Sequence, residues 1–298
     1  MKIASFDDHR IGVVKGESVY DVTDELGGAL GDWPVMRVNR LAAQWDTLKE
    51  AVAAAAQRVS AKPLSSVHLL AANPAPRQLF AAPANYRKHI GEIGARSVSK
   101  GRSANEIGFF MKASGSVVGA GGKIELPHSD GRRFDHESEL GVIIGHGGRN
   151  IARAQAFDHV FGYCNLIDVT MRIEPGVGEE ERVMRKSFAT FTPLGPWIVT
   201  KDEVANPQGL VNRLWVNGDL RQNANTSEMI VDIACLIEMI SSVVELNPGD
   251  VIATGTPEGV GPIKPGDRID IEVAGLGRLS LPVVRAATPE VRRWSVGP

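Results

Sequence analysis

Two glutamates in the stretch FDHESELGVIIG, residues 134–145, stand where a carboxylate is costly unless it has a partner. Side chains alternate between the two faces of a strand, so Glu137 and Glu139 share a face with Gly141 and Ile143. The two carboxylates are then roughly 7 Å apart along the strand. If this strand end is buried, the pair needs a cation or a shared proton. The alternative is an edge strand with one wetted face, but the apolar run that follows the glutamates favours the buried site.

A third acid that could complete such a site is Asp168, which ends the apolar run FGYCNLIDV. A lone carboxylate in a strand-like segment is rarely buried without a partner. Two glutamates give a metal only part of its ligand shell, so a further oxygen ligand should come from a neighbouring strand. Three carboxylates without paired histidines or cysteines favour Mg²⁺ or Mn²⁺, with Ca²⁺ also compatible, over Zn²⁺. The competing interpretation makes Asp168 a residue that caps the next turn.

A histidine and a glutamate three residues apart, His89 and Glu92, lie in ANYRKHIGEIG. On a helical turn this spacing places both on one face, where the carboxylate can orient the imidazole and raise its basicity. The pair then has the arrangement of a general base. The surrounding segment, residues 87–105, is polar and glycine-rich, so His89 considered alone is better explained as an exposed loop histidine. The same composition predicts a mobile lid that closes over bound ligand.

Two further segments place polar side chains beside apolar ones. Lys186, in RVMRKSFATFTPLGPWIVT, could neutralise an enolate or a carboxylate, or could extend its amine to solvent. The stretch IATGTPEGVGP offers a flexible backbone and the hydroxyls of Thr254 and Thr256. It lacks the Gly-Lys-Ser/Thr of a phosphate-binding loop, which excludes a nucleotide site of that type.

The elements that must position these residues form a small and a large unit. Residues 1–70 combine short strand-like runs with helical spacing in VNRLAAQWDTLKEAVAAAAQRV, which predicts a small α+β domain. A proline-rich join near residue 70 begins a second domain over residues 71–298. This domain is a series of strand-like runs with one clear helix, predicted over residues 227–246. Two Pro-Gly-Asp turns, which need glycine at positive φ, indicate a coiled and mostly antiparallel β architecture.

Composition excludes several classes of protein. The chain of 298 residues has a formal net charge of -2 and a pI near 6.4, so its charge gives no reason to expect nucleic acid or a membrane as partner. The sequence shows no leader-like segment and no run that approaches a membrane span, which predicts a cytoplasmic protein acting on small molecules. Cys164 and Cys235 lie in apolar contexts and are predicted to be buried thiols rather than nucleophiles.

Seven stretches together resemble the fumarylacetoacetate hydrolase family and span most of the chain from residue 80 to 284. They are NYRKHIGE, FMKASGSVVGAGGKIELP, FDHESELGVIIG, FGYCNLIDVTMR, RKSFATFTPLGPWIVT, VNGDLRQNANTSEMI and LNPGDVIATGTPEGVGPIKPGD. Their order and spacing are more specific than any one motif. The resemblance implies that a magnesium-like divalent ion binds to Glu137, Glu139 and Asp168.

The resemblance also assigns roles to the remaining candidate residues. It implies that His89 and Glu92 form a catalytic dyad on a lid helix and that Lys186 is the lysine that acts on the substrate. It further implies that Thr256 contacts the substrate. Arg172 matches an arginine, four residues after the metal-binding aspartate, that contacts substrate in members cleaving fumarylacetoacetate.

The fold implied by the resemblance is a small N-terminal α+β domain followed by a large mixed β-roll, usually in a homodimer. The chain departs from the family pattern in three places. His136 and Ser138 stand where the family often has tyrosine and valine. IEPGVGEEERVM follows Arg172, where many members have an Asp-Leu-Gln run, and AAPAN lacks the additional metal-binding aspartate of the fumarylacetoacetases.

The residues and the resemblance support one chemistry, in which a metal chelated by a 2-oxo acid stabilises an enolate. We expect hydrolysis of a C–C bond in an acylpyruvate-like 1,3-diketo acid. Decarboxylation of an oxaloacetate-like acid and isomerisation of an unsaturated 2-oxo diacid, such as a 2-hydroxymuconate-type compound, are the alternatives. A metal-independent glycosidase would need aromatic sugar platforms, and the aromatic content of 6% argues against it. A binding module derived from the family would be expected to lack a ligand or base, yet every matched position is retained.

Overall fold

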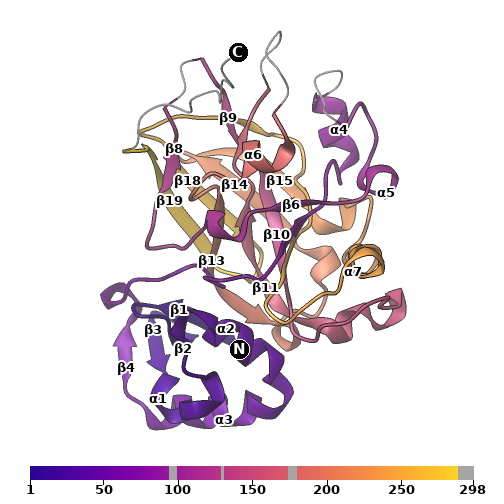
Figure 1. The fold of residues 1–298 in the computed structure, drawn as a ribbon. Helices are drawn as coiled ribbons and strands as arrows, with labels where there is room; N and C mark the ends of the chain where they lie inside the picture. Colours follow the sequence, from indigo (N-terminus) through magenta and orange to yellow (C-terminus); the bar gives the residue numbers. More distant parts are fainter. Residues whose placement is uncertain (94–98, 129–130, 174–179, 288–298) are drawn as a thin grey trace, which may run out of the picture.

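The computed structural model describes residues 1–93, 99–128, 131–173 and 180–287 of the chain (Figure 1). The fold is α+β, as the sequence predicts: a small N-terminal α+β unit, low in the view of Figure 1, precedes a large mixed β-roll. Among the described residues the strands form an eleven-stranded, a five-stranded and a three-stranded sheet. The largest sheet runs through both parts of the chain.

The N-terminal unit forms one end of the largest sheet and packs its helices against it. Its elements are β1 (Lys2–Phe6), β2 (Arg10–Lys15), β3 (Ser18–Asp21), α1 (Thr23–Leu26), α2 (Arg37–Ala43), α3 (Trp45–Arg58) and β4 (Ala61–Pro63). β1 pairs antiparallel with β13 (Thr192–Thr200), a strand of the roll. Trp45 of α3 meets Phe161 edge-on, with ring centroids 5.2 Å apart. The two parts on either side of residue 70 therefore share a sheet and a hydrophobic core.

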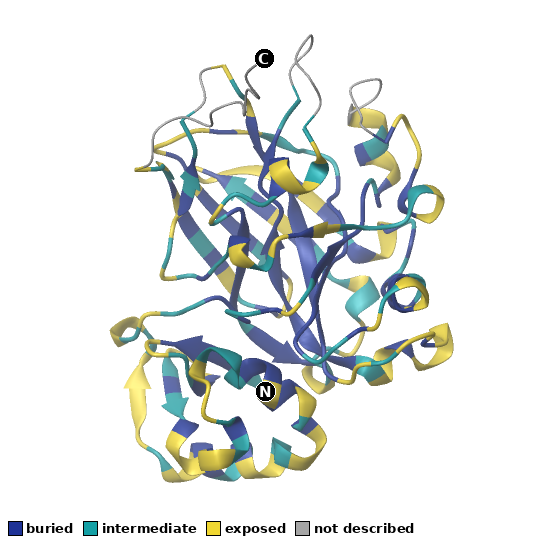
Figure 2. Cartoon of the chain, in the orientation of Figure 1, coloured by how far each residue is buried: buried dark blue, intermediate teal, exposed yellow. Residues whose placement is uncertain are grey.

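The middle of the largest sheet is buried (Figure 2). Its order continues from β13 through β11 (Val160–Ile167), β10 (Ser138–Ile144), β16 (Val251–Ala253) and β5 (Leu79–Ala81) to β6 (Phe110–Lys112). Every residue of β10 and β11 is buried, which explains why their sequences are nearly continuous apolar runs rather than alternating ones. β7 (Val117–Val118) pairs with β13 beside this path.

The rest of the roll is built from two smaller sheets. The five-stranded sheet contains β15 (Asp219–Asn225), β14 (Val211–Val216), β18 (Arg268–Val273), β19 (Arg278–Arg285) and β8 (Ile124–Leu126). The three-stranded sheet contains β12 (Thr170–Met171), β9 (Phe134–His136) and β17 (Gly261–Ile263). β14 alternates between buried and more exposed positions, the pattern of a strand with one face on a core.

The helices of the roll are short, and one of them differs from the sequence prediction. They are α4 (Arg87–Ile93), α5 (Ala104–Ile107), α6 (Arg182–Lys186) and α7 (Ile233–Val243). The helix predicted over residues 227–246 is only α7, because the Asp232 side chain accepts a hydrogen bond from Cys235 N and caps a later start. None of the described helices is long and apolar enough to cross a membrane.

Short 3₁₀ helices connect many of these elements. They are η1 (Gly27–Leu30), η2 (Pro34–Met36), η3 (Leu64–Ser66), η5 (Ser114–Ser116), η6 (Arg153–His159), η7 (Lys201–Glu203), η8 (Pro207–Gly209) and η9 (Thr226–Glu228). The glycines of the two Pro-Gly-Asp turns, Gly249 and Gly266, have φ of 84° and 99°, which confirms the predicted positive φ. Cys164 is buried as predicted, whereas Cys235 is only half-buried because it lies near the start of α7.

The stretch FDHESELGVIIG is not the single strand that its sequence predicts. The chain leaves the three-stranded sheet at His136 and enters the largest sheet at Ser138, so Glu137 lies at the crossing between β9 and β10. β9 pairs with β12 and β17, whereas β10 pairs with β11 and β16. This crossing brings the two sheets together at the glutamates.

Candidate metal centre and active site

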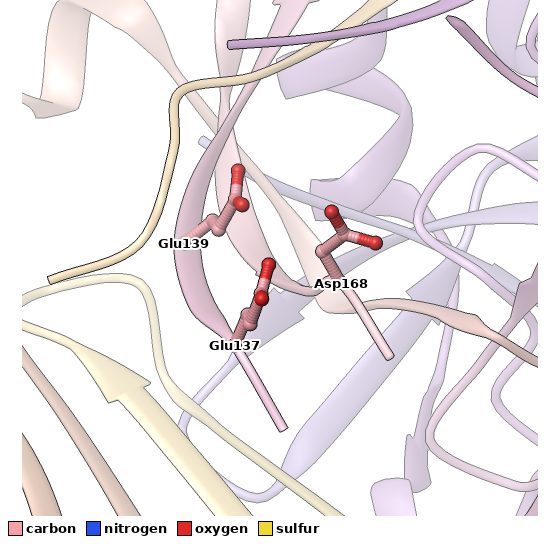
Figure 3. Close-up of side chains that lie close together, drawn as sticks. All are labelled: Glu137, Glu139 and Asp168. Atoms are coloured by element: carbon pink, nitrogen blue, oxygen red, sulfur yellow. The ribbon is translucent and has the colours of Figure 1, made fainter. Parts of the chain in front are cut away.

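The three predicted metal ligands converge at the crossing between the sheets. Ligand oxygens of Glu137, Glu139 and Asp168 all lie within 4.8 Å of one another, and all three residues are buried (Figure 3). Asp168 N donates a hydrogen bond of 2.8 Å to Glu137 O, and Glu139 is paired with Leu166. Asp168 and Glu137 are therefore cross-strand neighbours, which puts their side chains on one face.

Two buried lysines neutralise two of these carboxylates. Lys186 Nζ donates to Glu137 Oε2 at 2.8 Å and to Asp168 Oδ2 at 2.6 Å. It also donates to Thr170 Oγ1 at 2.6 Å, so all three of its donor positions are used. Lys112 Nζ donates to the other carboxylate oxygen of Asp168 and to Phe191 O. Lys186, which the sequence could also place in solvent, is 7% exposed and lies in the centre of the cluster.

Glu139 is the carboxylate that lacks a cationic partner. Its Oε2 accepts a hydrogen bond of 2.7 Å from Gly255 N. Among the described residues, no lysine, arginine or histidine forms an ion pair with it. Burial, together with the charges of Asp168 and Glu137, raises the pKa of Glu139 well above its ordinary value. A divalent cation would relieve this repulsion, so the donor set fits a hard metal ion bound by oxygen.

Glu137 has the opposite electrostatic environment. Burial alone would raise its pKa, but the positive charges of Lys186 and Arg172 outweigh burial and lower it. Arg172 Nη2 donates to Glu137 Oε1 at 2.7 Å. Arg172 Nε donates to Asp135 Oδ2, also at 2.7 Å. The guanidinium of Arg172, the predicted substrate-binding arginine, is thus held beside the cluster by Glu137, a member of it, and by Asp135, which is not.

The predicted dyad lies on α4, and Glu92 of this helix contacts the loop 254–259 of the roll. His89 is 4% exposed, so it is not the exposed loop histidine that its context alone suggests. His89 Nδ1 lies 3.4 Å from Glu92 Oε2, and Gly259 N donates to the Glu92 carboxylate at 3.1 Å. Lys88 of α4 also forms an ion pair of 2.8 Å with Glu228 of η9. Residues 94–98 of the predicted lid lie outside the described residues, and its mobility stays a prediction.

One loop, residues 254–259, contacts both the carboxylate cluster and the dyad. Gly255 N donates to Glu139, and Gly259 N donates to Glu92. Both glycines have positive φ, 92° and 89°. A Cβ at Gly255 would lie 2.6 Å from Asn85 Cβ, and one at Gly259 would lie 2.0 Å from Arg221 O. Positive φ and these close neighbours therefore require glycine at both positions of the loop.

Thr256, the predicted substrate-binding threonine, is in the middle of this loop. It is 4% exposed, and its hydroxyl accepts a hydrogen bond of 2.8 Å from Gln222 Nε2. The structure thus places all the predicted site residues in one connected region of the roll.

Three polar residues of this region were not identified from the sequence. Lys112 donates to Asp168, Thr170 accepts from Lys186, and Gln222 donates to Thr256. Lys112 ends the short run FFMK, and a lone cation after apolar residues was the available signal. Gln222 lies in a polar strand, where a single buried amide has no sequence signature.

The chain is similar to several known proteins. The model of the fumarylacetoacetate (FAA) hydrolase C-terminal domain matches residues 78–284. A maleylpyruvate hydrolase from Aquipseudomonas alcaligenes is 40% identical over 290 residues, covering 95% of this chain and 99% of the relative. The crystal structure of maleylpyruvate hydrolase from Sphingobium sp. SYK-6 has a TM-score of 0.85 and 40% identity, covering 96% of this chain and 100% of that one.

Two further structures extend the comparison. A complex of the Sphingobium enzyme with manganese(II) ion and pyruvate has a TM-score of 0.84 and 40% identity, covering 96% of this chain and 99% of that one. The 2-hydroxyhepta-2,4-diene-1,7-dioate isomerase from Mycobacterium marinum has a TM-score of 0.72 and 27% identity, covering 97% of this chain and 100% of that one. Both share the fold over nearly the full length.

These comparisons define the class of protein: an enzyme that depends on a divalent metal. The chain belongs to the fumarylacetoacetate hydrolase family.

Proposed function

We propose that the enzyme hydrolyses the C–C bond of an acylpyruvate, with maleylpyruvate as the compound to test first. Water adds its hydroxyl to the acyl carbon and a proton to the departing methylene, which yields pyruvate and the acid of the acyl group. The similarity to maleylpyruvate hydrolases over nearly the whole chain supports this reaction.

The observation that carries the proposal is the loop 254–259, which links the proposed general base, His89 with Glu92, to the carboxylate cluster. One end of the loop holds Glu139, and the other end holds Glu92. Decarboxylation needs little from a base, so a buried histidine oriented by a fixed carboxylate would contribute little to it. Hydrolysis requires a base that activates water, and the contacts of His89 and Glu92 support that role.

The side chains take the following roles in the proposal. A divalent ion held by Glu137, Glu139 and Asp168 would supply positive charge where negative charge develops on the substrate oxygen. The carboxylate of Glu92 accepts from His89 Nδ1, which leaves Nε2 free to take a proton from water.

The cations near the cluster would act on charge. Lys186 and Arg172 hold positive charge beside the site and would stabilise an anionic substrate without a covalent bond. The hydroxyl of Thr256 would donate to an oxygen at the 2-oxo acid end of the substrate, because its neighbour Gly255 contacts the cluster.

Isomerisation of an unsaturated 2-oxo diacid is the second candidate. A dyad that takes a proton from water can also move one between two carbon atoms. Relatives of this kind share the fold at lower identity, such as the 27% of the Mycobacterium marinum isomerase. Both reactions would use the same groups, so only the products distinguish them.

The experiment is a substrate panel with product identification. Maleylpyruvate, an uncharged acylpyruvate, oxaloacetate and an unsaturated 2-oxo diacid are each incubated with enzyme and Mg²⁺ or Mn²⁺, with and without chelator. We expect chelator-sensitive release of pyruvate from the acylpyruvates. Turnover of oxaloacetate or the diacid, without hydrolysis of either acylpyruvate, would overturn the proposal.

We also propose that the enzyme works in the cytoplasm as a homodimer and that Mg²⁺ or Mn²⁺ is its physiological ion. We further propose that residues 1–70 are a small N-terminal domain, which shares a sheet and a core with the rest of the chain. Family resemblance supports the dimer, the oxygen-only donor set supports the ion, and the proline-rich join supports the boundary. Light scattering on the purified protein tests the dimer, and a monomer at all concentrations would refute it.

A further inference from the structure

Gln222 is a buried amide in a strand that is otherwise mostly exposed. In β15 only Gln222 and Ala224 are buried, and Gln222 is 1% exposed. Its side chain reaches from the five-stranded sheet to the crossing between β9 and β10 and to the loop 254–259. No role assigned to the site above explains why a polar side chain of this strand is buried there.

Backbone partners determine how the amide of Gln222 is oriented. Ser138 N can only donate, and it donates to Gln222 Oε1 at 2.9 Å. Pro257 O can only accept, and it accepts from Gln222 Nε2 at 3.0 Å. The oxygen and nitrogen of the amide are therefore not interchangeable, because a flipped amide would lose both bonds.

The oriented amide in turn determines where two protons lie. Gln222 Oε1 also faces His136 Nδ1 at 3.0 Å, so that ring nitrogen must carry a proton. Gln222 Nε2 donates to Thr256 Oγ1 at 2.8 Å, so the threonine oxygen is an acceptor in this bond. The hydroxyl proton of Thr256 must then point elsewhere, and no described residue accepts it. The Thr256 hydroxyl is therefore a donor without a partner among the described residues, and it lies next to Gly255, whose N contacts Glu139.

The same side chain also contacts both neighbours of Glu137. It bonds to the His136 ring on one side and to Ser138 N on the other. These are the two positions at which this chain departs from the tyrosine and valine that the family often has. One amide thus connects the strand crossing that carries Glu137 with the loop that carries Thr256.

We propose that Gln222 is a positioning residue that presents the Thr256 hydroxyl as a hydrogen-bond donor to an oxygen at the 2-oxo acid end of the substrate. The inference rests on the proposed function, because it assumes that a 2-oxo acid binds beside the carboxylate cluster. Gln222 itself does not touch the substrate. Its effect passes through Thr256, so the two residues must be energetically coupled.

The test is a double-mutant cycle with ligand binding as the readout. Wild type, Gln222→Met, Thr256→Val and the double variant are loaded with Mn²⁺, and oxalate affinity is measured by titration calorimetry. We expect Gln222→Met to weaken oxalate binding about tenfold, the effect of one lost hydrogen bond. In the Thr256→Val background the same change should weaken oxalate binding less than about twofold. In a Thr256→Ser background, which keeps the hydroxyl, the loss should again be about tenfold.

Two controls separate positioning from a general loss of structure. Mn²⁺ affinity without oxalate should be the same in Gln222→Met and wild type, because Gln222 makes no contact with a carboxylate of the cluster. If Gln222→Met does not fold, Gln222→Asn keeps an amide for the buried polar groups but withdraws it from Thr256, and the same cycle is run with it.

The outcomes distinguish this inference from the proposed function. Equal losses of oxalate affinity in the wild-type and Thr256→Val backgrounds, or no loss in either, would overturn the positioning role. Failure of wild type to hydrolyse any acylpyruvate, with the coupling intact, would overturn only the proposed reaction. Loss of Mn²⁺ affinity in Gln222→Met would also overturn the inference, since the residue would then act on the metal cluster.

Discussion

The carboxylate cluster and the histidine-glutamate pair are held by different kinds of structure. Glu139 lies in the central strand β10, Asp168 directly follows the central strand β11, and Glu137 lies at the crossing between β9 and β10. Two buried lysines neutralise part of the charge of these acids. His89 and Glu92 lie on α4, a helix of two turns that is fastened by an exposed ion pair and a contact to a loop. The two groups therefore depend on interactions of very different strength.

This difference separates stability from catalysis. Removing one member of a buried ion pair leaves an uncompensated charge in a dry environment, which is strongly destabilising. Exposed ion pairs contribute little, because solvent screens them. Changes in the cluster should therefore alter folding and metal binding together, whereas changes on α4 should alter turnover with little effect on either.

The largest expected effect comes from two acids of the cluster, Glu139, which has no cationic partner among the described residues, and Asp168, which has two. Glu139→Gln and Asp168→Asn should each weaken Mn²⁺ binding by more than about a hundredfold, beyond the effect of an outer-shell partner. Without metal, Glu139→Gln should raise the melting temperature, because it removes a charge with no cationic partner. Asp168→Asn should lower it, because Lys112 and Lys186 lose their shared partner. Calorimetry and thermal unfolding in chelator measure both quantities.

Wild type with saturating Mn²⁺ is the matched control for these two variants. Mn²⁺ should raise the melting temperature of wild type, whereas the melting temperatures of both variants should stay nearly unchanged when Mn²⁺ is added. A fall in the melting temperature of metal-free Glu139→Gln, equal to that of Asp168→Asn, would contradict the different electrostatic roles of the two acids.

Lys112→Met should be the most destabilising change that leaves all three carboxylates in place. The variant breaks a fully buried pair, which costs about 3–5 kcal/mol of the free energy of unfolding. Asp168 keeps its bond from Lys186, so the site can still bind metal. Denaturant unfolding with and without Mn²⁺ measures the loss and how much of it the ion restores.

The exposed Lys123 serves as the control for this prediction, since it pairs with Glu125 at the surface. Lys123→Met should change the free energy of unfolding by no more than about 1 kcal/mol. Equal effects of the two lysine variants would show that burial of the Lys112 pair does not matter.

The convergence of the three acids could be predicted from sequence because it follows from simple rules. Alternation along a strand puts Glu137 and Glu139 on one face, and an apolar run makes a terminal Asp168 conspicuous. The strand crossing at Glu137 was not predicted, because local alternation continues through it while the hydrogen-bonding partners change. The start of α7 was open to prediction, since Asp232 is a favoured N-cap residue.

The supporting residues could not be predicted for a different reason. Lys112 meets Asp168 across 56 positions of sequence, and Gln222 meets Ser138 across 84. Such pairs depend on the order of strands in the sheets, which neither periodicity nor composition contains. The resemblance to a family supplied the candidate site residues, whereas their hydrogen-bond partners could be identified only in the structure.

His89→Gln should reduce turnover while leaving the cluster intact. Loss of a general base lowers kcat by about 10²–10⁴-fold. Mn²⁺ affinity should stay within about twofold of wild type, because neutral glutamine of similar size replaces a residue outside the ligand set. Steady-state kinetics on an acylpyruvate and calorimetry test the two parts. Unchanged turnover would remove the dyad from the mechanism and favour decarboxylation, which needs least from a base.

The smallest expected effect concerns the pH dependence of α4. Burial tends to raise the pKa of Glu92, but hydrogen bonds from His89 and Gly259 N outweigh burial and lower it below 4.5. A lowered pKa in the folded state stabilises the docked helix above the ordinary pKa, and this contribution is lost as the pH falls through the lowered value. Glu92 is 37% exposed, so solvent screening limits the effect to no more than about 1 kcal/mol.

Hydrogen exchange of the α4 amides, corrected for intrinsic rates, measures this effect between about pH 6 and about pH 4. We expect protection of α4 to fall at the lower pH while protection of β10 and β11 stays constant, because the central strands do not rely on Glu92. Glu92→Gln should remove most of the change. His89 and the acids that face Lys88, Glu228 and Glu258, remain in that variant, so any residual pH dependence reports His89 and the ion pairs of Lys88 together. Equal pH dependence in wild type and Glu92→Gln would contradict the prediction, because the Glu92 carboxylate would then contribute nothing to the docking of α4.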